Sequence, residues 1–178
     1  MAYSLAERTY LDMAKECRNE HDYEKAIHYL KKISPNSEIC EMLGELFYSC
    51  GNESDKAEAE GYFKQAEDYF RWAAKEGNFE AMCNYAYFCA DSEEKLMYYK
   101  RAADAGIGYA MNMVGILMEK KCADADDPKE KNAPAAWFRK AADAGEPVGA
   151  YNYSFYTDDE EEKKQYLKQA ADAGYTTA

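Results

Sequence analysis

Two histidines and six cysteines are the side chains with which this chain of 178 residues could carry out acid–base or nucleophilic chemistry. A Ser-His-Asp or Cys-His arrangement would need His21 or His28 as its base. His21 precedes Asp22 in a predicted turn, and His28 lies beside Tyr29 on a predicted helix, so we interpret both as surface residues. The sequence therefore contains no convincing catalytic triad or dyad.

The cysteines do not have the spacing of a metal site. None forms a C-x-x-C pair, and zinc-finger spacing is absent. Two interpretations stay open, namely three disulfides in an exported protein or reduced and mostly buried thiols. The segment 1–8 has no basic head followed by an apolar stretch, which favours reduced thiols and a cytoplasmic location. The six positions are Cys17, Cys40, Cys50, Cys83, Cys89 and Cys122.

Other motifs for metals, phosphates or acid–base chemistry are weak. Asp124, Asp126 and Asp127 are spaced like part of a calcium loop, but its glycine and its closing glutamate are missing. The segment 106–108 is glycine-rich, yet it follows a predicted helix, whereas a phosphate-binding loop follows a strand. None of the paired carboxylates has the apolar surroundings that raise a pKa. We therefore predict no metal, no cofactor and no enzymatic activity.

The net charge of −12 narrows the choice of partners. An acidic surface disfavours nucleic acids and anionic membranes, since both carry negative charge. It favours a partner with a basic surface. The alternative is that the charge only keeps the protein soluble. No apolar run approaches the ~20 residues that span a bilayer. A protein or peptide is thus the expected partner.

A recurring pattern is the main structural signal. Four segments carry two alanines, two further residues and a glycine, and successive glycines are 29, 39 and 29 residues apart. A large ring stands four residues before each first alanine, which places both on one helix face. The alanines permit close helix packing, and the glycine ends the helix in a left-handed conformation. The segments are 73–77, 102–106, 141–145 and 170–174, after Tyr69, Tyr98, Trp137 and Tyr166.

Each repeat is predicted to hold two helices. Residues 84–106 align with residues 152–174 without a gap. Acidic runs at 91–94 and 158–161 are expected where second helices begin, because carboxylates stabilise the positive end of a helix.

The N-terminal third carries a related but different unit. An apolar stripe at helical spacing runs from Tyr10 to Cys17, and a second helix is predicted over 22–33, where Pro35 stops it. A long helix is predicted over about 55–76. The chain is therefore expected to be all-α, with five antiparallel helix pairs in one domain over 1–178 and a polar loop over 122–132.

These patterns resemble Sel-1-like repeats, a branch of the tetratricopeptide-like (TPR-like) superfamily. The matching stretches are 110–115 and 137–145, with Sel-1-like units over 37–178 and a TPR-like unit over 1–36. The first-helix glycine of the family is present at two repeats and is replaced by another small residue at two. The regularly spaced cysteine pairs of exported members are absent, which argues against the disulfide-stapled subgroup. The four first-helix positions are Gly44, Ala86, Gly115 and Ser154.

The resemblance implies a right-handed superhelix whose first helices line a concave groove, and an adaptor that holds peptides or proteins without chemistry of its own. Asn84 and Asn152 match the asparagine with which such proteins hold a ligand main chain. Tyr87 and Phe155 would supply apolar pockets. Alternatively, Tyr87, Ile116 and Phe155 would pack between adjacent helix pairs. Helical spacing selects the full groove set, which is Cys83, Asn84, Tyr87, Asn112, Met113, Ile116, Tyr151, Asn152 and Phe155.

A self-assembling structural module is the alternative function. The segment 175–178 resembles the opening of a further unit, such as 78–81, and the sequence then stops. The last second helix, with Tyr166 and Leu167, would then lack a polar cap. We therefore expect either a homodimer through this end or an N-terminal fragment of a longer repeat protein.

Overall fold

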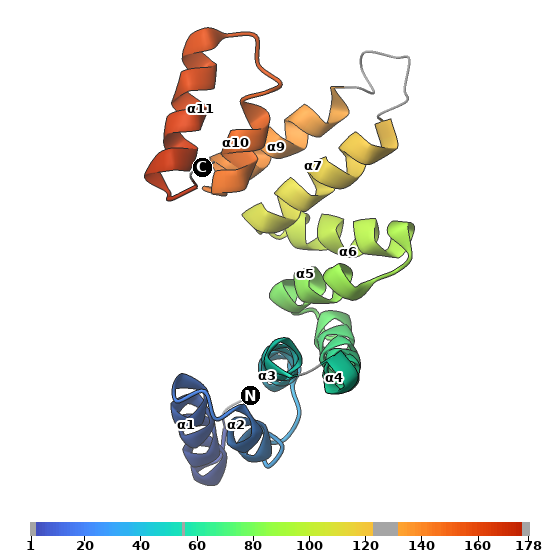
Figure 1. The fold of residues 1–178 in the computed structure, drawn as a ribbon, viewed down its shortest axis with the longest axis vertical. Coiled ribbons are helices and arrows are strands. Elements are labelled where there is room, and N and C mark those ends of the chain that lie inside the picture. The colour runs from blue at the N-terminus through green and yellow to red at the C-terminus, as the bar shows by residue number, and fades with distance from the viewer. Residues whose placement is uncertain (1–2, 55, 123–131, 176–178) are drawn as a thin grey trace. The chain divides into compact units, whose positions relative to one another are not determined.

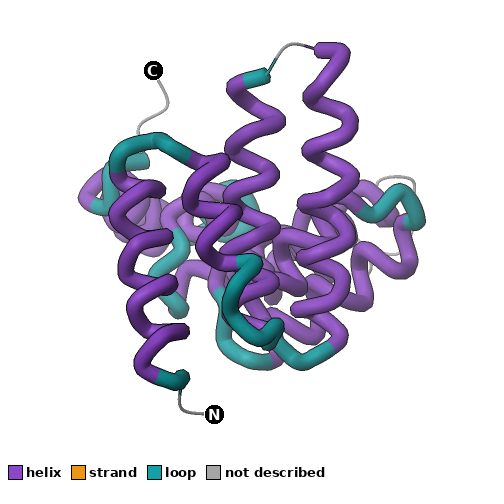
Figure 2. The backbone as a smooth tube through the Cα atoms, turned by 90° about the horizontal axis from the view of Figure 1, so that it is seen from below, coloured by secondary structure: helices purple, strands orange, loops and turns teal. Residues whose placement is uncertain are grey.

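The computed structural model describes residues 3–54, 56–122 and 132–175, and all regular structure in these ranges is helical (Figures 1 and 2). The chain divides into two compact units, residues 1–88 and residues 89–178, and each is described by itself. Unit 1 holds α1 (Leu5–Asn19), α2 (Tyr23–Leu30), α3 (Ser37–Glu53), α4 (Lys56–Lys75) and α5 (Phe79–Phe88). Unit 2 holds α6 (Ser92–Asp104), α7 (Gly108–Cys122), α9 (Ala133–Asp143), α10 (Pro147–Tyr153) and α11 (Glu160–Asp172).

The prediction of an all-α chain of paired helices is confirmed. In unit 1, α1 packs against α2, α2 against α3, α3 against α4, and α4 against α5. In unit 2, α6 packs against α7, α7 against α9, and α10 against both α9 and α11. The polar loop predicted over 122–132, with Asp124, Asp126 and Asp127, falls on residues 123–131, which lie outside the described ranges.

Polar side chains cap the N-terminal ends of the helices. Ser4 and Glu7 form a capping box at α1, in which the Ser4 hydroxyl accepts from the Glu7 backbone N–H and the Glu7 carboxylate accepts from the Ser4 N–H. Asp91 accepts from the Glu94 backbone N–H at 2.8 Å and so caps α6. Asp159 does the same for two N–H groups at the start of α11. The acidic runs therefore mark second-helix starts, as predicted.

The recurring glycines end the second helices in one shared geometry. Gly77, Gly106, Gly145 and Gly174 have φ values of 94°, 98°, 84° and 87°, in the left-handed region. The residue after each glycine donates its N–H to the carbonyl of the first alanine of the pair, at 2.9–3.2 Å. This is the Schellman arrangement, which satisfies the last carbonyls of a helix. The predicted role of the glycines is confirmed.

The two helices of a repeat approach closely where the first-helix glycine faces a ring. A Cβ built on Gly44 of α3 would lie 2.7 Å from Phe70 of α4. A Cβ built on Gly115 of α7 would lie 2.5 Å from Phe138 of α9. Phe70 and Phe138 occupy equivalent positions of their repeats, and both are buried. The same packing thus occurs in both units.

The core of unit 2 joins the last two repeats. Its buried side chains come from α9, α10 and α11, and Tyr153 meets Tyr166 edge-to-face at 4.8 Å between ring centroids. The first alanine of each repeat pair is at most 1% exposed, which agrees with close helix packing. The clustered residues are Phe138, Ala142, Ala150, Tyr153, Tyr166 and Ala170.

The helix α10 ends earlier than the repeat pattern indicates. It stops at Tyr153, whereas α5 continues through Tyr87 to Phe88. Ser154 stands where α5 has Ala86, and its hydroxyl donates to the Tyr151 carbonyl at 2.7 Å. A serine hydroxyl that bonds the local backbone competes with helix continuation. Phe155 therefore lies just beyond α10.

Within the described ranges, no helix combines the length and the apolar character that crossing a bilayer requires.

Candidate binding surface

The first-helix residues predicted in unit 1 are split between surface and core. Tyr87 is 60% exposed, and its ring meets Tyr48 of α3 edge-to-face at 6.2 Å. Asn84 lies one turn earlier on α5 and is half-buried. No described group forms a hydrogen bond with the Asn84 amide. Unit 1 therefore presents a large ring and a hydrogen-bonding amide on one side of α5.

Cys83 lies beneath this surface. It is 4% exposed, and burial together with the nearby Glu80 carboxylate raises the pKa of its thiol to about 12. A thiol with so high a pKa stays protonated at neutral pH and is a poor nucleophile and metal ligand. Cys83 is thus a small apolar residue of the core.

In unit 2, two of the predicted asparagines bond to each other. Asn152 Nδ2 of α10 donates to Asn112 Oδ1 of α7 at 2.8 Å. Asn112 is only 3% exposed, while Asn152 is half-buried. The bond satisfies the buried amide oxygen of Asn112 and holds α10 against α7. It also leaves the Asn152 side-chain oxygen available at the surface.

Three rings gather beside Asn152. Tyr151 meets Phe155 edge-to-face at 5.0 Å, and it meets Tyr175 at 5.1 Å between ring centroids. Phe155 is 64% exposed, whereas Tyr151 and Tyr175 are half-buried and pack against the unit 2 core. Phe155 therefore projects from a support of packed aromatic rings.

The remaining predicted residues lie on α7. Met113 is half-buried. Ile116 is half-buried too and packs against the core cluster of unit 2. Ile116 thus contributes to the packing of the unit 2 core.

Comparison with known proteins adds the fold family to this geometry. A scan against protein-family models finds no match, and a search of the curated proteins finds none either. The chain is similar to the crystal structure of a Sel1 repeat protein from Oxalobacter formigenes, with a TM-score of 0.71 and 17% sequence identity over 93% of this chain and 70% of that one. The chain has the Sel1-repeat fold.

A second solved structure agrees. The protein c5321, a protective antigen present in uropathogenic Escherichia coli strains and displaying an SLR fold, is similar with a TM-score of 0.67 and 20% sequence identity. The match covers 85% of this chain and 34% of c5321, so the chain spans about a third of that protein's length. In the Sel1-repeat fold of this chain, α3, α5, α7 and α10 are first helices, and α4, α6, α9 and α11 are second helices.

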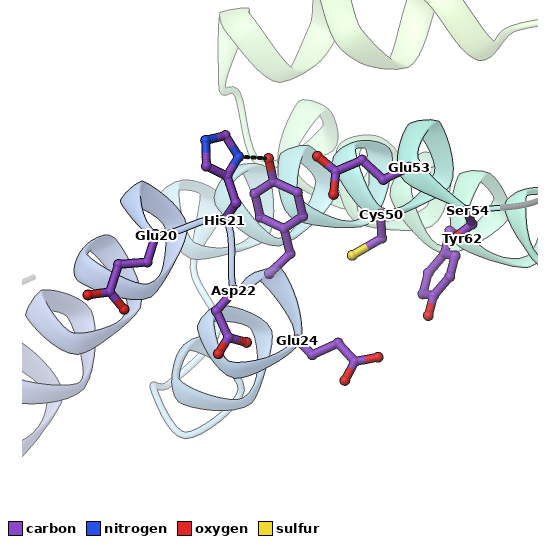
Figure 3. Close-up of a pocket in the computed structure, with 9 residues that line it drawn as sticks. Glu20, His21, Asp22, Glu24, Cys50, Glu53, Ser54 and Tyr62 are labelled. Carbon is purple, nitrogen blue, oxygen red and sulfur yellow. Dashed lines mark hydrogen bonds between the residues drawn. The ribbon is translucent and has the colours of Figure 1, made fainter.

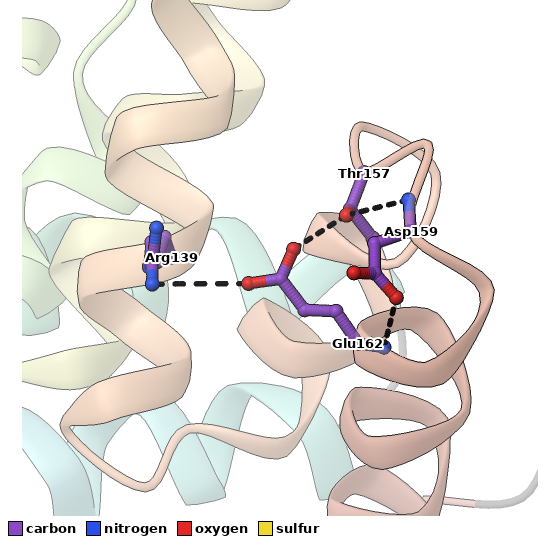
Figure 4. A network of polar contacts seen from close by, with 4 residues as sticks. All are labelled: Arg139, Thr157, Asp159 and Glu162. Atoms are coloured by element: carbon purple, nitrogen blue, oxygen red, sulfur yellow. Dashed lines mark hydrogen bonds and ion pairs between the residues drawn. The ribbon is translucent and has the colours of Figure 1, made fainter.

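A polar network that the sequence pattern does not reveal supports the segment after Phe155 (Figure 4). Thr157 Oγ1 donates to Glu162 Oε2 at 2.5 Å, and Arg139 Nη2 of α9 lies 3.7 Å from Glu162 Oε1. The Asp159 backbone N–H donates to Thr157 Oγ1 at 3.3 Å. Thr157 therefore ties the connection between Phe155 and α11 to Glu162 of α11, which in turn pairs with Arg139 of α9.

The described residues form no metal-binding site. No group of three or more His, Cys, Asp or Glu side chains there is arranged to hold a metal ion. His21 and His28 are both exposed, in the turn and on the helix where the sequence places them. What the described surface offers is exposed rings beside amide groups, an arrangement suited to binding.

Proposed function

We propose that the chain is a non-enzymatic scaffold that binds a peptide or another protein on the exposed side of its first helices. The contact residues are the amides of Asn84 and Asn152 and the rings of Tyr87, Tyr151 and Phe155, with Met113 as a further candidate. Cys83 and Ile116 pack beneath this surface. Asn112 also lies beneath it and orients Asn152 through the hydrogen bond between the two side chains.

One observation carries the proposal. Tyr87 and Phe155 occupy equivalent positions of two repeats, lie in different units, and expose most of their rings. Covering an aromatic ring of this size stabilises a complex by about 1–2 kcal/mol, given that part of each ring is already buried. Rigid aromatic side chains also lose little entropy on binding. The neighbouring amides offer both a donor and an acceptor for a peptide main chain.

The charge of the chain bears on the partner. With a net charge of −12, the protein attracts a partner with a basic surface and repels acidic ones. Binding should therefore weaken as salt is added, since screening reduces attraction between exposed charges.

Peptide selection followed by calorimetry tests the proposal. Peptides are selected from a random library displayed on phage, with the full chain as bait, and their dissociation constants are measured. Phe155→Ser and Tyr87→Ser should each weaken binding roughly 5- to 30-fold. Met97→Ser, which removes another exposed apolar side chain from α6, is the matched control and should leave the affinity unchanged. The proposal fails if the control weakens binding as much as the ring variants do.

Self-association through the last repeat is the second candidate, because the ring cluster around Phe155 lies at the C-terminal end of unit 2. The outward side of α11 is less suited to this role, since its exposed side chains include Lys164, Gln165, Lys168 and Asp172. Sedimentation at tens of micromolar separates the candidates. A monomer rules out the dimer, while a dimer that Phe155→Ser dissociates would replace the scaffold proposal. Residues 176–178 lie outside the described ranges.

A further inference from the structure

Unit 1 carries an acidic hollow at the turn between α1 and α2 (Figure 3). Its volume is about 430 Å³, and its walls come from that turn, from the end of α3 and from Tyr62 of α4. Glu20, Glu24 and Glu53 form no ion pair with any described residue. Asp22 also lines the hollow, but Lys25 already pairs with it at 2.5 Å. Glu20, Glu24, Glu53 and Tyr62 thus line a hollow whose negative charge suits a cationic side chain.

An apolar hollow of about 280 Å³ lies near the other end of α4. Pro35, Cys40, Tyr69 and Trp72 line it, with Asp68 at its edge. The Trp72 side chain remains 39% exposed beside this hollow. Burial raises the pKa of the Cys40 thiol, as expected beside apolar walls. This hollow suits a large apolar side chain.

The two hollows share one face of α4. Tyr62 borders the acidic hollow and Tyr69 the apolar one, and residues seven apart lie on the same side of a helix. Both rings pack against Phe47 of α3, at 6.4 and 5.5 Å between centroids. Between Tyr62 and Trp72 the helix rises by roughly 10–15 Å. An extended peptide covers that distance in about three to five residues.

Lys31 lies beside Phe47, the ring that contacts both Tyr62 and Tyr69. Its Nζ lies over the Phe47 ring, 5.1 Å from the centroid. A positive charge at this middle position repels a cationic side chain there and so directs it to the acidic end.

We propose that this face of unit 1 binds a peptide segment with a basic side chain and a large apolar side chain three or four residues apart. The basic side chain enters the hollow of Glu20, Glu24 and Glu53, and the apolar side chain enters the hollow beside Trp72. Charge complementarity selects the occupant, because three carboxylates that pair with no described cation favour a basic side chain and disfavour acidic ligands. This site uses residues of the turn between α1 and α2 and of α2, α3 and α4, and it is separate from the first-helix residues proposed above.

An NMR titration of the full ¹⁵N-labelled chain tests the proposal. The probe is the capped peptide Trp-Ala-Ala-Ala-Arg, unlabelled and at millimolar concentration. The chain has two tryptophans, Trp72 in unit 1 and Trp137 in unit 2, so their indole N–H signals report separately. We expect the probe to shift the Trp72 signal and to leave the Trp137 signal unmoved. A titration that moves neither signal, or only that of Trp137, overturns the proposal.

Matched probes and variants test each end. Replacing the arginine with neutral citrulline, or the tryptophan with serine, should weaken binding at least fivefold. In the protein, Glu24→Gln/Glu53→Gln should weaken binding roughly fivefold at low salt. The control Asp104→Asn/Asp143→Asn removes the same charge from unit 2 and should change the affinity less than twofold. Equal binding of the citrulline probe, or equal loss with the control, refutes the charge assignment.

Two further outcomes separate this site from the first-helix surface. Tyr87→Ser and Phe155→Ser should leave binding of the probe unchanged. If they abolish it, the probe binds the first-helix surface, so this inference fails while the proposed function stands. If spermidine alone shifts the Trp72 signal as far as the peptide does, the acidic hollow acts without the apolar one, and the two-ended site is refuted.

Discussion

Alanine at Gly44 tests the glycine–ring packing within a repeat. A Cβ at this position would lie 2.7 Å from Cδ1 and from Cε1 of Phe70, and 3.0 Å from Cγ. Carbon atoms in favourable contact are about 3.5–4.0 Å apart, so the ring or the helix must move. Phe70 is buried and stacks against Phe88 at 6.1 Å, which restricts its movement.

Two opposing effects set the magnitude. Overpacking a core typically destabilises by about 1–3 kcal/mol. Alanine is favoured over glycine inside a helix by roughly 0.5–1 kcal/mol, which acts in the other direction. We therefore expect Gly44→Ala to lower the free energy of unfolding by about 1–2 kcal/mol.

Gly61 on α4 is the matched control. A Cβ there would meet no atom within 4 Å, and the residue is exposed. Only the helix-propensity gain applies, so Gly61→Ala should raise the free energy of unfolding by roughly 0.5–1 kcal/mol. Both positions lie in unit 1, and urea unfolding followed by circular dichroism measures both. The same substitution should thus act with opposite sign at the two positions.

The reasoning is refuted if Gly44→Ala is as stable as the wild type or more stable. A second test uses the background Phe70→Ala, which removes the ring atoms Cγ, Cδ1 and Cε1 that lie nearest to Gly44. There the penalty for alanine at position 44 should fall to less than half. An unchanged penalty would show that the ring is not its cause.

Three other perturbations have defined outcomes. Asn152→Ala removes the donor to Asn112 and leaves the buried Asn112 oxygen unsatisfied, so the free energy of unfolding should fall by about 1–3 kcal/mol. Adding Asn112→Leu should recover part of this loss. No recovery would contradict the role of the bond. Hydrogen bonds from Ser4 and Ser34 lower the pKa of Glu7 from 4.5 to about 2, so its carboxylate stabilises the fold above pH 4.5 and this contribution is lost as the pH falls toward 2. Glu7→Gln should therefore lower the Tm at neutral pH and flatten its decline over that interval, whereas a parallel decline in both proteins would refute the assignment. Iodoacetamide should alkylate the half-buried Cys17 and Cys122 in the native protein but not Cys83, because burial raises the pKa of the Cys83 thiol to about 12. A mass spectrum that shows early modification of Cys83 would contradict its place in the core.

The second helices could be predicted from sequence because their signals are local. An alanine pair followed by glycine specifies both close packing and a left-handed helix end within five residues. The acidic residues that cap α6 and α11 are equally local, since Asp91 and Asp159 bond N–H groups two or three residues ahead. These features hold in the structure.

The exposure of the predicted groove residues is harder to predict from sequence, because burial depends on contacts between helices. Helical spacing put Cys83 and Asn112 on the same face as their neighbours, yet both are buried, because adjacent helices cover that edge of the face. The early end of α10 follows from the Ser154 hydroxyl, which bonds the Tyr151 carbonyl at a position where two of the other repeats have glycine.

The two hollows of unit 1 could not be read from the sequence. The acidic hollow joins residues 20–24 to residues near 53 and 62, and the apolar hollow joins Pro35 and Cys40 to Trp72. Only the packing of the turn between α1 and α2 and of α2, α3 and α4 brings these segments together. A sequence pattern reports faces of single helices, while a hollow is defined by the side chains of several.

Site-specific photo-crosslinking tests the central claim most directly. A benzoylphenylalanine is placed at position 155 in one variant, at position 87 in a second, and at position 97 in a control, and each is irradiated with a peptide selected on the wild-type chain. The account predicts crosslinks from positions 155 and 87 and none from position 97. A crosslink from position 97 alone, or from all three with equal yield, would contradict the assignment of binding to the first-helix surface.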